Sequence, residues 1–317
     1  MKIMYTDIDH KDLSIEEGVV AAAGMEFTIA QCKTEDEVIE KCKGAEILIN
    51  QYAPITEKVC EALPEFKMVV RYGVGVDNID VKACIAHGVT VCNIPDYGTN
   101  DVADHTLALT MAILRKIPFM TEYTRHVGWD CSKCFPITRM SELTVGILGF
   151  GRIGKAYAQR MHAMGCKIIA CDHHLAPGQV AECGYATGVT LEELVEKSDV
   201  ISIHCPPEKG RYILNADMIA RMKDGVYLVN CARGGIIDED ALDLALESGH
   251  VAGAALDCTK QEPMPVDHKL FRHDNFLCTP HMAWYSVEAS ADLKRKVAEQ
   301  AVKFAQTGTV DYPVLKN

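Results

Sequence analysis

The sequence has 317 residues, of which 48% are hydrophobic and 24% charged, and this composition suits a packed globular protein with sizeable cores. Its formal net charge of −12 argues against broad binding to the phosphate backbone of nucleic acids, which requires clustered Lys and Arg. No apolar run approaches the length that spans a bilayer, so neither nucleic acid nor membrane is an expected partner.

The fourteen cysteines occur at irregular spacings, often inside apolar runs. This pattern indicates reduced thiols and a cytoplasmic location rather than a disulfide framework. Cys131 and Cys134 form one C-x-x-C, which could be a redox pair or, with His126, half of a metal site. Because no second pair follows at zinc spacing, two loop thiols are the favoured interpretation, and we predict no metal.

Short apolar runs alternate with helical stretches along the chain. The runs are rich in β-branched residues and nearly continuous, which is typical of strands buried on both faces of a parallel sheet. The predicted strands are residues 1–7, 45–50, 67–71, 89–93, 143–148, 167–170, 200–204, 226–230 and 251–256. The alternation predicts repeated βαβ units and an α/β fold.

Two sheets are expected, one over roughly 1–97 and one from Thr144 to about 283, with a helix at 101–115 between them. The irregular segment 118–142 is interpreted as a protruding arm or dimer contact. The last helix, about 287–307, comes too late to extend the second sheet simply, so we expect it to return to the first domain. The predicted domains are 1–97 plus 286–317, and 98–285.

The strongest local motif is a glycine loop, G-x-G-x-x-G, formed by Gly149, Gly151 and Gly154. It follows an apolar strand and opens a helical stretch, as a dinucleotide-binding turn requires. The first glycine permits the tight turn, the second lets the backbone approach a diphosphate, and the third lets helix and strand pack closely. The N–H groups at the helix start then face the phosphate charge.

The next predicted strand ends at Asp172, 18 residues past Gly154. A carboxylate at this place can hydrogen-bond the adenine ribose hydroxyls and repel a 2′-phosphate, which favours NAD over NADP. His204 and Pro206 lie past a later strand and are expected to line the dinucleotide.

Three polar residues past the ends of later strands suggest acid–base chemistry on a carboxylate substrate. The Arg233 guanidinium could clamp a substrate carboxylate and polarise a keto oxygen. Hydride transfer to a ketone needs a proton donor at the forming alkoxide, and His281 suits this near neutral pH. Glu262 is the candidate carboxylate that orients His281 and favours its acid form.

These motifs, in this order, resemble the D-isomer-specific 2-hydroxyacid dehydrogenases over nearly the whole chain. The resemblance rests on three regions: the glycine loop with its acidic residue, the N-x-A-R-G-G segment at 230–235 and the T-P-H segment at 279–281. The family's catalytic Arg, Glu and His match Arg233, Glu262 and His281, at spacings of 29 and 19 residues. The segment with Trp284 after the histidine resembles the same segment in the C-terminal-binding-protein group and its bacterial, phosphoglycerate dehydrogenase-like relatives, which also carry a Trp there.

The resemblance implies two Rossmann-like domains with parallel sheets, a flavodoxin-like substrate domain and an NAD-binding domain, with a cleft between them. It implies an NAD-dependent oxidoreductase that interconverts a small D-2-hydroxy acid and its 2-keto acid. It also implies a homodimer formed through the NAD-binding domains, and domain closure over the substrate.

The resemblance further implies which residues make contacts. The expected substrate contacts are Arg71, Val74, Gly75, Arg233, His281 and Trp284. With the glycine loop included, the expected cofactor contacts are Gly149, Gly151, Arg152, Ile153, Gly154, Asp172, His204, Cys205, Pro206, Arg211, Cys231, Ala232, Arg233, Asp257, His281 and Ala283.

Alternatives remain at this stage. Phosphoglycerate dehydrogenases usually place an Arg near the end of the strand that here reads 48–52, and Gln51 and Tyr52 stand there instead. This weakens, without removing, the case for a phosphorylated substrate. A second alternative is an NAD(H)-sensing interaction protein of the corepressor type. Formate oxidation is disfavoured because formate dehydrogenases of this superfamily carry Gln where Glu262 stands.

Overall fold

The computed structural model describes residues 1–315, which form two compact units. One unit contains residues 1–98 and the C-terminal segment that begins at Ser286, and the other is Thr99–Tyr285. Each unit carries one sheet in which every strand pair is parallel. The predicted α/β class with two parallel sheets is therefore confirmed.

The first unit has a five-stranded sheet in the flavodoxin-like order β2-β1-β3-β4-β5. Its strands are β1 (Ile3–Tyr5), β2 (Phe27–Ile29), β3 (Ile47–Asn50), β4 (Met68–Arg71) and β5 (Thr90–Cys92). All four residues of β3 are buried, as expected of a central strand covered on both faces.

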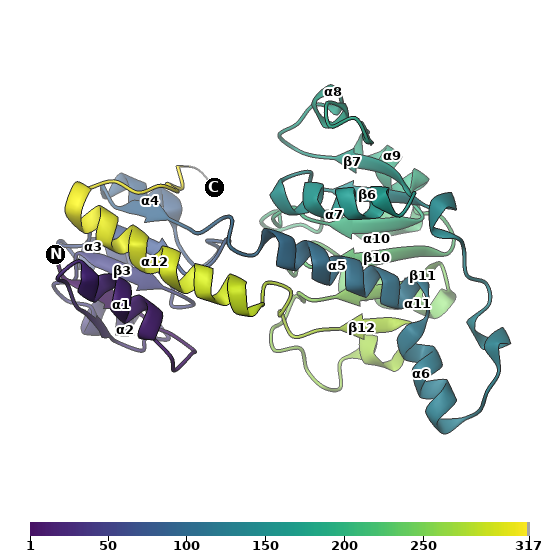
Figure 1. Ribbon diagram of the computed structural model, residues 1–317, viewed down its shortest axis with the longest axis horizontal. Coiled ribbons are helices and arrows are strands. Elements are labelled where there is room, and N and C mark those ends of the chain that lie inside the picture. Colours follow the sequence, from purple (N-terminus) through teal and green to yellow (C-terminus); the bar gives the residue numbers. More distant parts are fainter. Residues whose placement is uncertain (316–317) are drawn as a thin grey trace. The chain divides into compact units, whose positions relative to one another are not determined.

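Helices cover both faces of this sheet. On one face, the side chains of α2 (Glu35–Lys41), α3 (Glu57–Ala62) and α4 (Val81–Ala86) pack against alternate strand residues. On the other face lie α1 (Ser14–Ala22) and α12 (Val287–Thr307), which contact each other (Figure 1). The last helix of the chain thus completes the core of the first unit.

The second unit has a seven-stranded sheet in the order β12-β11-β10-β9-β6-β7-β8. Its strands are β6 (Thr144–Leu148), β7 (Lys167–Cys171), β8 (Ala186–Gly188), β9 (Val200–Ile203), β10 (Val226–Asn230), β11 (Val251–Leu256) and β12 (Phe276–Cys278). Without β12, this is the Rossmann strand order. The order reverses between β6 and β9, and ligands of such sheets bind at the carboxyl ends of the strands near that reversal.

Two helical layers cover the second sheet. Helices α5 (Thr99–Leu114) and α7 (Arg152–Ala163) pack together on one face (Figure 1). Side chains from α9 (Leu191–Lys197), α10 (Ala216–Ala220) and α11 (Glu239–Ser248) pack on the core of the other face. The short helix α8 (Pro177–Ala181) contacts the edge strand β8.

The sequence prediction was wrong for part of the segment 118–142. The segment is not irregular throughout, because α6 (Ile117–His126) begins it, followed by the 3-10 turns Cys131–Cys134 and Met140–Glu142. Pro118 in the first turn of α6 is compatible with a helix, because the early N–H groups have no intrahelical acceptor. No residue of α6 is buried, and Trp129 just beyond it is 93% exposed.

Three strands, β2, β8 and β12, were not among those predicted. Each has three residues at a sheet edge, and their partly exposed side chains lack the continuous apolar pattern of the central strands. Within residues 1–315, no helix is at once long enough and apolar enough to cross a membrane.

Candidate active site

The three positions of the loop between β6 and α7 are glycine for different structural reasons. A Cβ on Gly154 would lie 2.1 Å from the Gly149 carbonyl oxygen, and one on Gly149 would lie 2.6 Å from the His204 carbonyl carbon. A Cβ on Gly151 would meet nothing within 4 Å. The outer two glycines therefore permit close packing, whereas the side of Gly151, at the N-terminus of α7, is open. These residues fit an NAD diphosphate.

Asp172, directly after β7, anchors this loop. Its Oδ2 accepts a hydrogen bond of 2.7 Å from the Phe150 N–H, and its Oδ1 accepts from the N–H groups of His174 and Leu175. The carboxylate stands beside the glycine loop, as expected of a ribose-binding residue, and it has a second role that the sequence did not indicate. Oδ1 thus uses both of its lone pairs, and Oδ2 keeps one for a further donor.

The half-buried His204 packs beside Ser202 and Tyr157. Its Nε2 lies 2.8 Å from Ser202 Oγ, and its ring centroid lies 5.3 Å from that of Tyr157. Burial lowers the pKa of His204 to about 3. The imidazole is therefore neutral near pH 7, which excludes it as a proton donor there.

His281 and Glu262 form the carboxylate–imidazole pair that the sequence predicted. Nδ1 of His281 lies 2.7 Å from Glu262 Oε2, and Glu262 Oε1 accepts from the Thr259 N–H at 3.0 Å. Partial burial works to raise the pKa of Glu262, but the hydrogen bond and charge of His281, the Thr259 N–H and the Arg233 charge outweigh it. The pKa of Glu262 is therefore held below its ordinary value, and the group is a carboxylate near neutral pH.

Buried Asp257, at the end of β11, organises the turn that carries His281. Its Oδ1 accepts hydrogen bonds from the Thr279 hydroxyl and the Met282 N–H, and its Oδ2 accepts from the Ala283 N–H. The His281 N–H donates to the Asp257 carbonyl at 2.9 Å. These contacts hold His281 at φ 52°, a left-handed conformation that non-glycine residues rarely adopt.

Arg233 lies in the loop after β10, which packs closely on the loop after β11. A Cβ on Gly234 would lie 1.9 Å from the Thr259 carbonyl oxygen, so this contact requires glycine. Asn230 shapes the Arg233 turn, because its Nδ2 donates to the Arg233 carbonyl at 2.7 Å and its Oδ1 accepts from the Ala232 N–H. The close loop packing brings Arg233 near Glu262, and the Arg233 charge helps to lower the pKa of Glu262.

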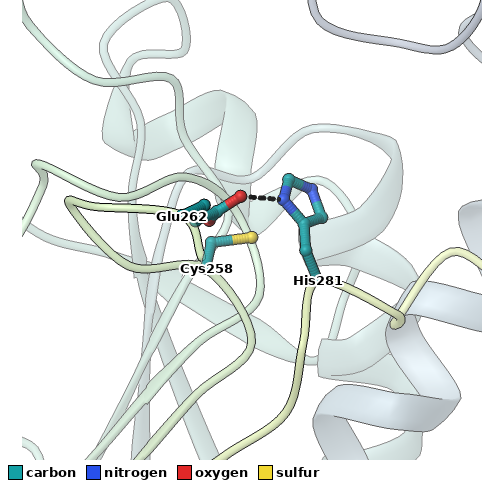
Figure 2. A group of neighbouring side chains, drawn as sticks. All are labelled: Cys258, Glu262 and His281. Atoms are coloured by element: carbon teal, nitrogen blue, oxygen red, sulfur yellow. Dashed lines mark hydrogen bonds and ion pairs between the residues drawn. The ribbon is translucent and has the colours of Figure 1, made fainter. Parts of the chain in front are cut away.

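Figure 2 shows a third side chain beside the pair. Cys258, which follows Asp257, lies next to Glu262 and His281, and one ligand atom from each of the three residues lies within 4.8 Å of the other two. Cys258 is 1% exposed, whereas the side chains of Glu262 and His281 are 39% and 41% exposed. The sequence did not indicate a role for this thiol, because it closely follows the apolar strand β11, as a core residue would.

The other predicted residues of the second unit lie in two settings. Ala283 is buried and Trp284 half-buried in one apolar cluster with Cys231, and the Trp284 and Tyr285 rings meet edge to face. The Cys231 side chain is therefore in the core. Arg211 is exposed, and its Nε donates to Glu208 at 2.5 Å.

Arg71, Val74 and Gly75 belong to the first unit, at and beyond the carboxyl end of β4. The Arg71 side chain folds over Gly73, where a Cβ would lie 1.8 Å from Arg71 Nη1, and Nη1 donates to the Tyr72 carbonyl. Asn93 Nδ2 donates to the Val74 carbonyl at 2.6 Å. These contacts hold the 71–75 loop within its own unit.

Comparisons with known proteins agree on one family. Residues 107–283 match the NAD binding domain of the D-isomer specific 2-hydroxyacid dehydrogenases. The chain is 40% identical over 261 residues to the D-3-phosphoglycerate dehydrogenase of Bacillus subtilis, covering 82% of this chain and 49% of that protein. The chain thus spans about half the length of this curated relative.

Solved structures of related proteins superpose over nearly the whole chain. A glyoxylate reductase from Paecilomyes thermophila is 27% identical, with a TM-score of 0.89, and the match covers 99% of this chain and 98% of that one. A D-lactate dehydrogenase from Aquifex aeolicus, complexed with NAD and lactic acid, is 25% identical, with a TM-score of 0.86, and the match covers 100% of both chains.

Proposed function

We propose a reaction from one premise: this chain belongs to the D-isomer-specific 2-hydroxyacid dehydrogenase family. It interconverts a small D-2-hydroxy acid and its 2-keto acid, with NAD bound at the N-terminus of α7. The observation that carries the proposal is the 2.7 Å contact between His281 Nδ1 and Glu262 Oε2, with Arg233 on the adjoining loop. The Arg233 guanidinium follows β10, the Glu262 carboxylate follows β11 and the His281 imidazole follows β12. These three groups suit acid–base chemistry on a carboxylate substrate.

His281 moves the proton of the reaction. The carboxylate of Glu262 accepts the Nδ1 hydrogen, which leaves Nε2 for the substrate oxygen. In keto-acid reduction, the imidazolium donates its Nε2 proton to the carbonyl oxygen, and in the reverse direction the neutral imidazole takes it back. NAD, when bound, supplies or accepts the hydride.

Arg233 binds the substrate carboxylate and polarises the keto oxygen through its planar guanidinium. Asn230 and the tight contact at Gly234 hold its backbone in place. Trp284 borders the substrate in the second unit. In the first unit, Arg71, Val74 and Gly75 remain proposed substrate contacts. The remaining predicted loop residues, such as Pro206 and Cys205, border the cofactor.

A phosphorylated substrate is the second candidate, because the curated relative from Bacillus subtilis is a D-3-phosphoglycerate dehydrogenase. The first unit argues for an unphosphorylated one. At the carboxyl ends of β1 and β3, the Tyr52 hydroxyl donates to Asp9 Oδ2 at 2.9 Å, and Gln51 Oε1 accepts from the Asp9 N–H. An acidic group at this edge repels a phosphate.

The proposal includes a homodimer and a reducing, cytoplasmic location. The dimer forms through the second unit, where α6 and the segment after it expose Val127, Trp129 and Phe135. All fourteen cysteines are free thiols, as a reducing compartment requires.

The test is a panel of 2-keto acids, with and without a phosphate group, assayed with NADH. His281→Ala should lower kcat about 10²–10⁴-fold, the range of general acid–base contributions, and change the Kd for NADH little. His87→Ala, at an exposed position of the first unit, is the control. Unchanged turnover in His281→Ala would remove this residue as proton donor. Tight NADH binding without reduction of any keto acid would favour the dinucleotide-sensing alternative.

A further inference from the structure

We propose that Cys258, Glu262 and His281 form a binding site for a thiophilic divalent cation, with Zn²⁺ the best fit, and that this cation reversibly stops the enzyme. The binding part of the proposal depends on the three side chains alone. The inhibition part rests on the proposed role of His281 as proton carrier. The composition and the cysteine spacing predict no metal site, because the three residues come together only in the fold.

The geometry is close to that of a three-ligand site. The thiol, carboxylate and imidazole atoms lie within 4.8 Å of one another (Figure 2). Zinc binds sulfur at about 2.3 Å and nitrogen or oxygen at about 2.0–2.2 Å, so its tetrahedral ligand atoms are roughly 3.3–3.8 Å apart. Side-chain rotations of at most about an ångström, while the Glu262–His281 hydrogen bond opens slightly, would seat the ion.

The chemical character of the ligands selects the cation. One sulfur, one nitrogen and one carboxylate oxygen suit Zn²⁺, Co²⁺ or Cd²⁺, whereas Mg²⁺ and Ca²⁺ prefer oxygen ligands only. Both Glu262 and buried Asp257 are close enough to Cys258 to act on it electrostatically. Arg233 also acts on Cys258 electrostatically, and the two carboxylates offset its positive charge. The local charge thus tolerates a dication.

Access is possible from the side of the acid–base pair. Cys258 is 1% exposed, but the side chains of Glu262 and His281 are about two-fifths exposed, so a cation reaches the site past them. Three protein ligands leave one coordination position for water or for a carboxylate ligand. The buried sulfur forms the inner wall of the site.

The consequence for the reaction follows from the shared atoms. A cation on Nδ1 of His281 replaces the hydrogen that Nδ1 now shares with Glu262. The ring then carries its one hydrogen on Nε2, and transfer of that hydrogen to the substrate would leave an imidazolate anion instead of a neutral imidazole, so the transfer is strongly disfavoured. The enzyme therefore loses its proton donor while the nucleotide loop, on other elements, is untouched.

The experiment uses Co²⁺ as a spectroscopic probe in a Cys131→Ser/Cys134→Ser background, so that no signal arises from these two closely spaced thiols, one exposed and one half-buried. A thiolate ligand gives cobalt an intense near-ultraviolet charge-transfer band. We expect one Co²⁺ per chain with this band, its displacement by Zn²⁺, and its loss in Cys258→Ser. Cys183→Ser, a half-buried thiol elsewhere in the second unit, is the matched control and should retain the band.

Activity provides the second readout. Zn²⁺ should inhibit keto-acid reduction by the background protein, a chelator should restore it, and Cys258→Ser should raise the inhibitory concentration at least about tenfold. Cys258→Ala replaces Cys258→Ser if the latter misfolds. No cobalt–thiolate band, or a band that persists in both Cys258 variants, would overturn the site. A band in a protein without turnover would keep the site and refute the proposed function instead.

Discussion

At the scale of single residues, the candidate site depends on carboxylates that bind backbone N–H groups. Asp257 holds the turn of His281, and Asp172 holds the glycine loop through the Phe150 N–H. Both were predicted as cofactor contacts, and the structure gives each a second, structural role. A substitution at either position therefore changes loop geometry as well as any direct contact.

Asp172 provides a prediction on cofactor choice. Asp172→Asn retains the oxygen that can accept from Phe150 but removes the negative charge that repels a 2′-phosphate. We expect the ratio of kcat/KM for NADPH to that for NADH to rise by about tenfold, or roughly 1.4 kcal/mol. The thermal midpoint is the control for loop integrity. An unaltered cofactor ratio in a folded variant would show that Asp172 does not read the ribose.

His204 provides a prediction on acid stability. Its folded pKa of about 3 is below the ordinary 6.5, so between these values the unfolded chain binds a proton that the native protein does not. Stability therefore rises with pH across this window and falls on acidification, by up to about 1.4 kcal/mol per pH unit.

His204→Gln should remove this contribution, so its free energy of unfolding should depend less steeply on pH than that of the parent protein. Denaturant titrations over the window measure the two slopes. His87→Gln, exposed on the first unit, should keep the parent slope. Equal slopes for the parent and His204→Gln would contradict a buried neutral imidazole.

At the scale of elements, the loop between β6 and α7 contains one glycine that matters for ligand binding and another that matters for stability. Gly151 has φ −77° and open space where a Cβ would be, whereas a Cβ on Gly154 would lie 2.1 Å from a carbonyl oxygen. Position 151 therefore has room for a methyl group in the absence of ligand, whereas position 154 does not.

The two positions predict opposite outcomes. Gly151→Ala should leave the thermal midpoint unchanged and weaken NADH binding by about tenfold or more, because the methyl group occupies the space assigned to the diphosphate. Gly154→Ala should instead lower stability by about 1–3 kcal/mol through overpacking. Calorimetry for binding and for unfolding measures both effects. A Gly151→Ala protein with parental NADH affinity would place the nucleotide elsewhere.

At the scale of the whole molecule, the second unit exposes apolar side chains that a stable monomer usually covers. Trp129 is 93% exposed and lies just after α6, which itself has no buried residue. A large aromatic side chain is a common anchor of protein interfaces. This segment is therefore the candidate contact for a second copy.

Trp129→Asp should shift the protein from dimer to monomer in light scattering coupled to size exclusion. Val266→Asp is the matched control, since Val266 is 95% exposed in the same unit but lies far from α6 in sequence. The control should remain dimeric. A monomeric parent protein, or a Trp129→Asp dimer as stable as the parent, would refute this interface.

The sequence by itself determined the local features of this protein. The α/β class, the central strands and the glycine loop were predictable, because apolar runs and glycine positions act through nearby backbone. The short edge strands β2, β8 and β12 and the helix α6 were missed, because each has too few buried residues to leave a pattern.

Only the tertiary structure decided which distant side chains meet. Parallel strand order places the ends of β10, β11 and β12 side by side, so Glu262 reaches His281 across 19 residues of sequence. The same order brings the Cys258 thiol to this pair and directs the Asp257 carboxylate into the histidine turn. No local pattern encodes these contacts, because they depend on side-chain directions that packing between neighbouring loops imposes.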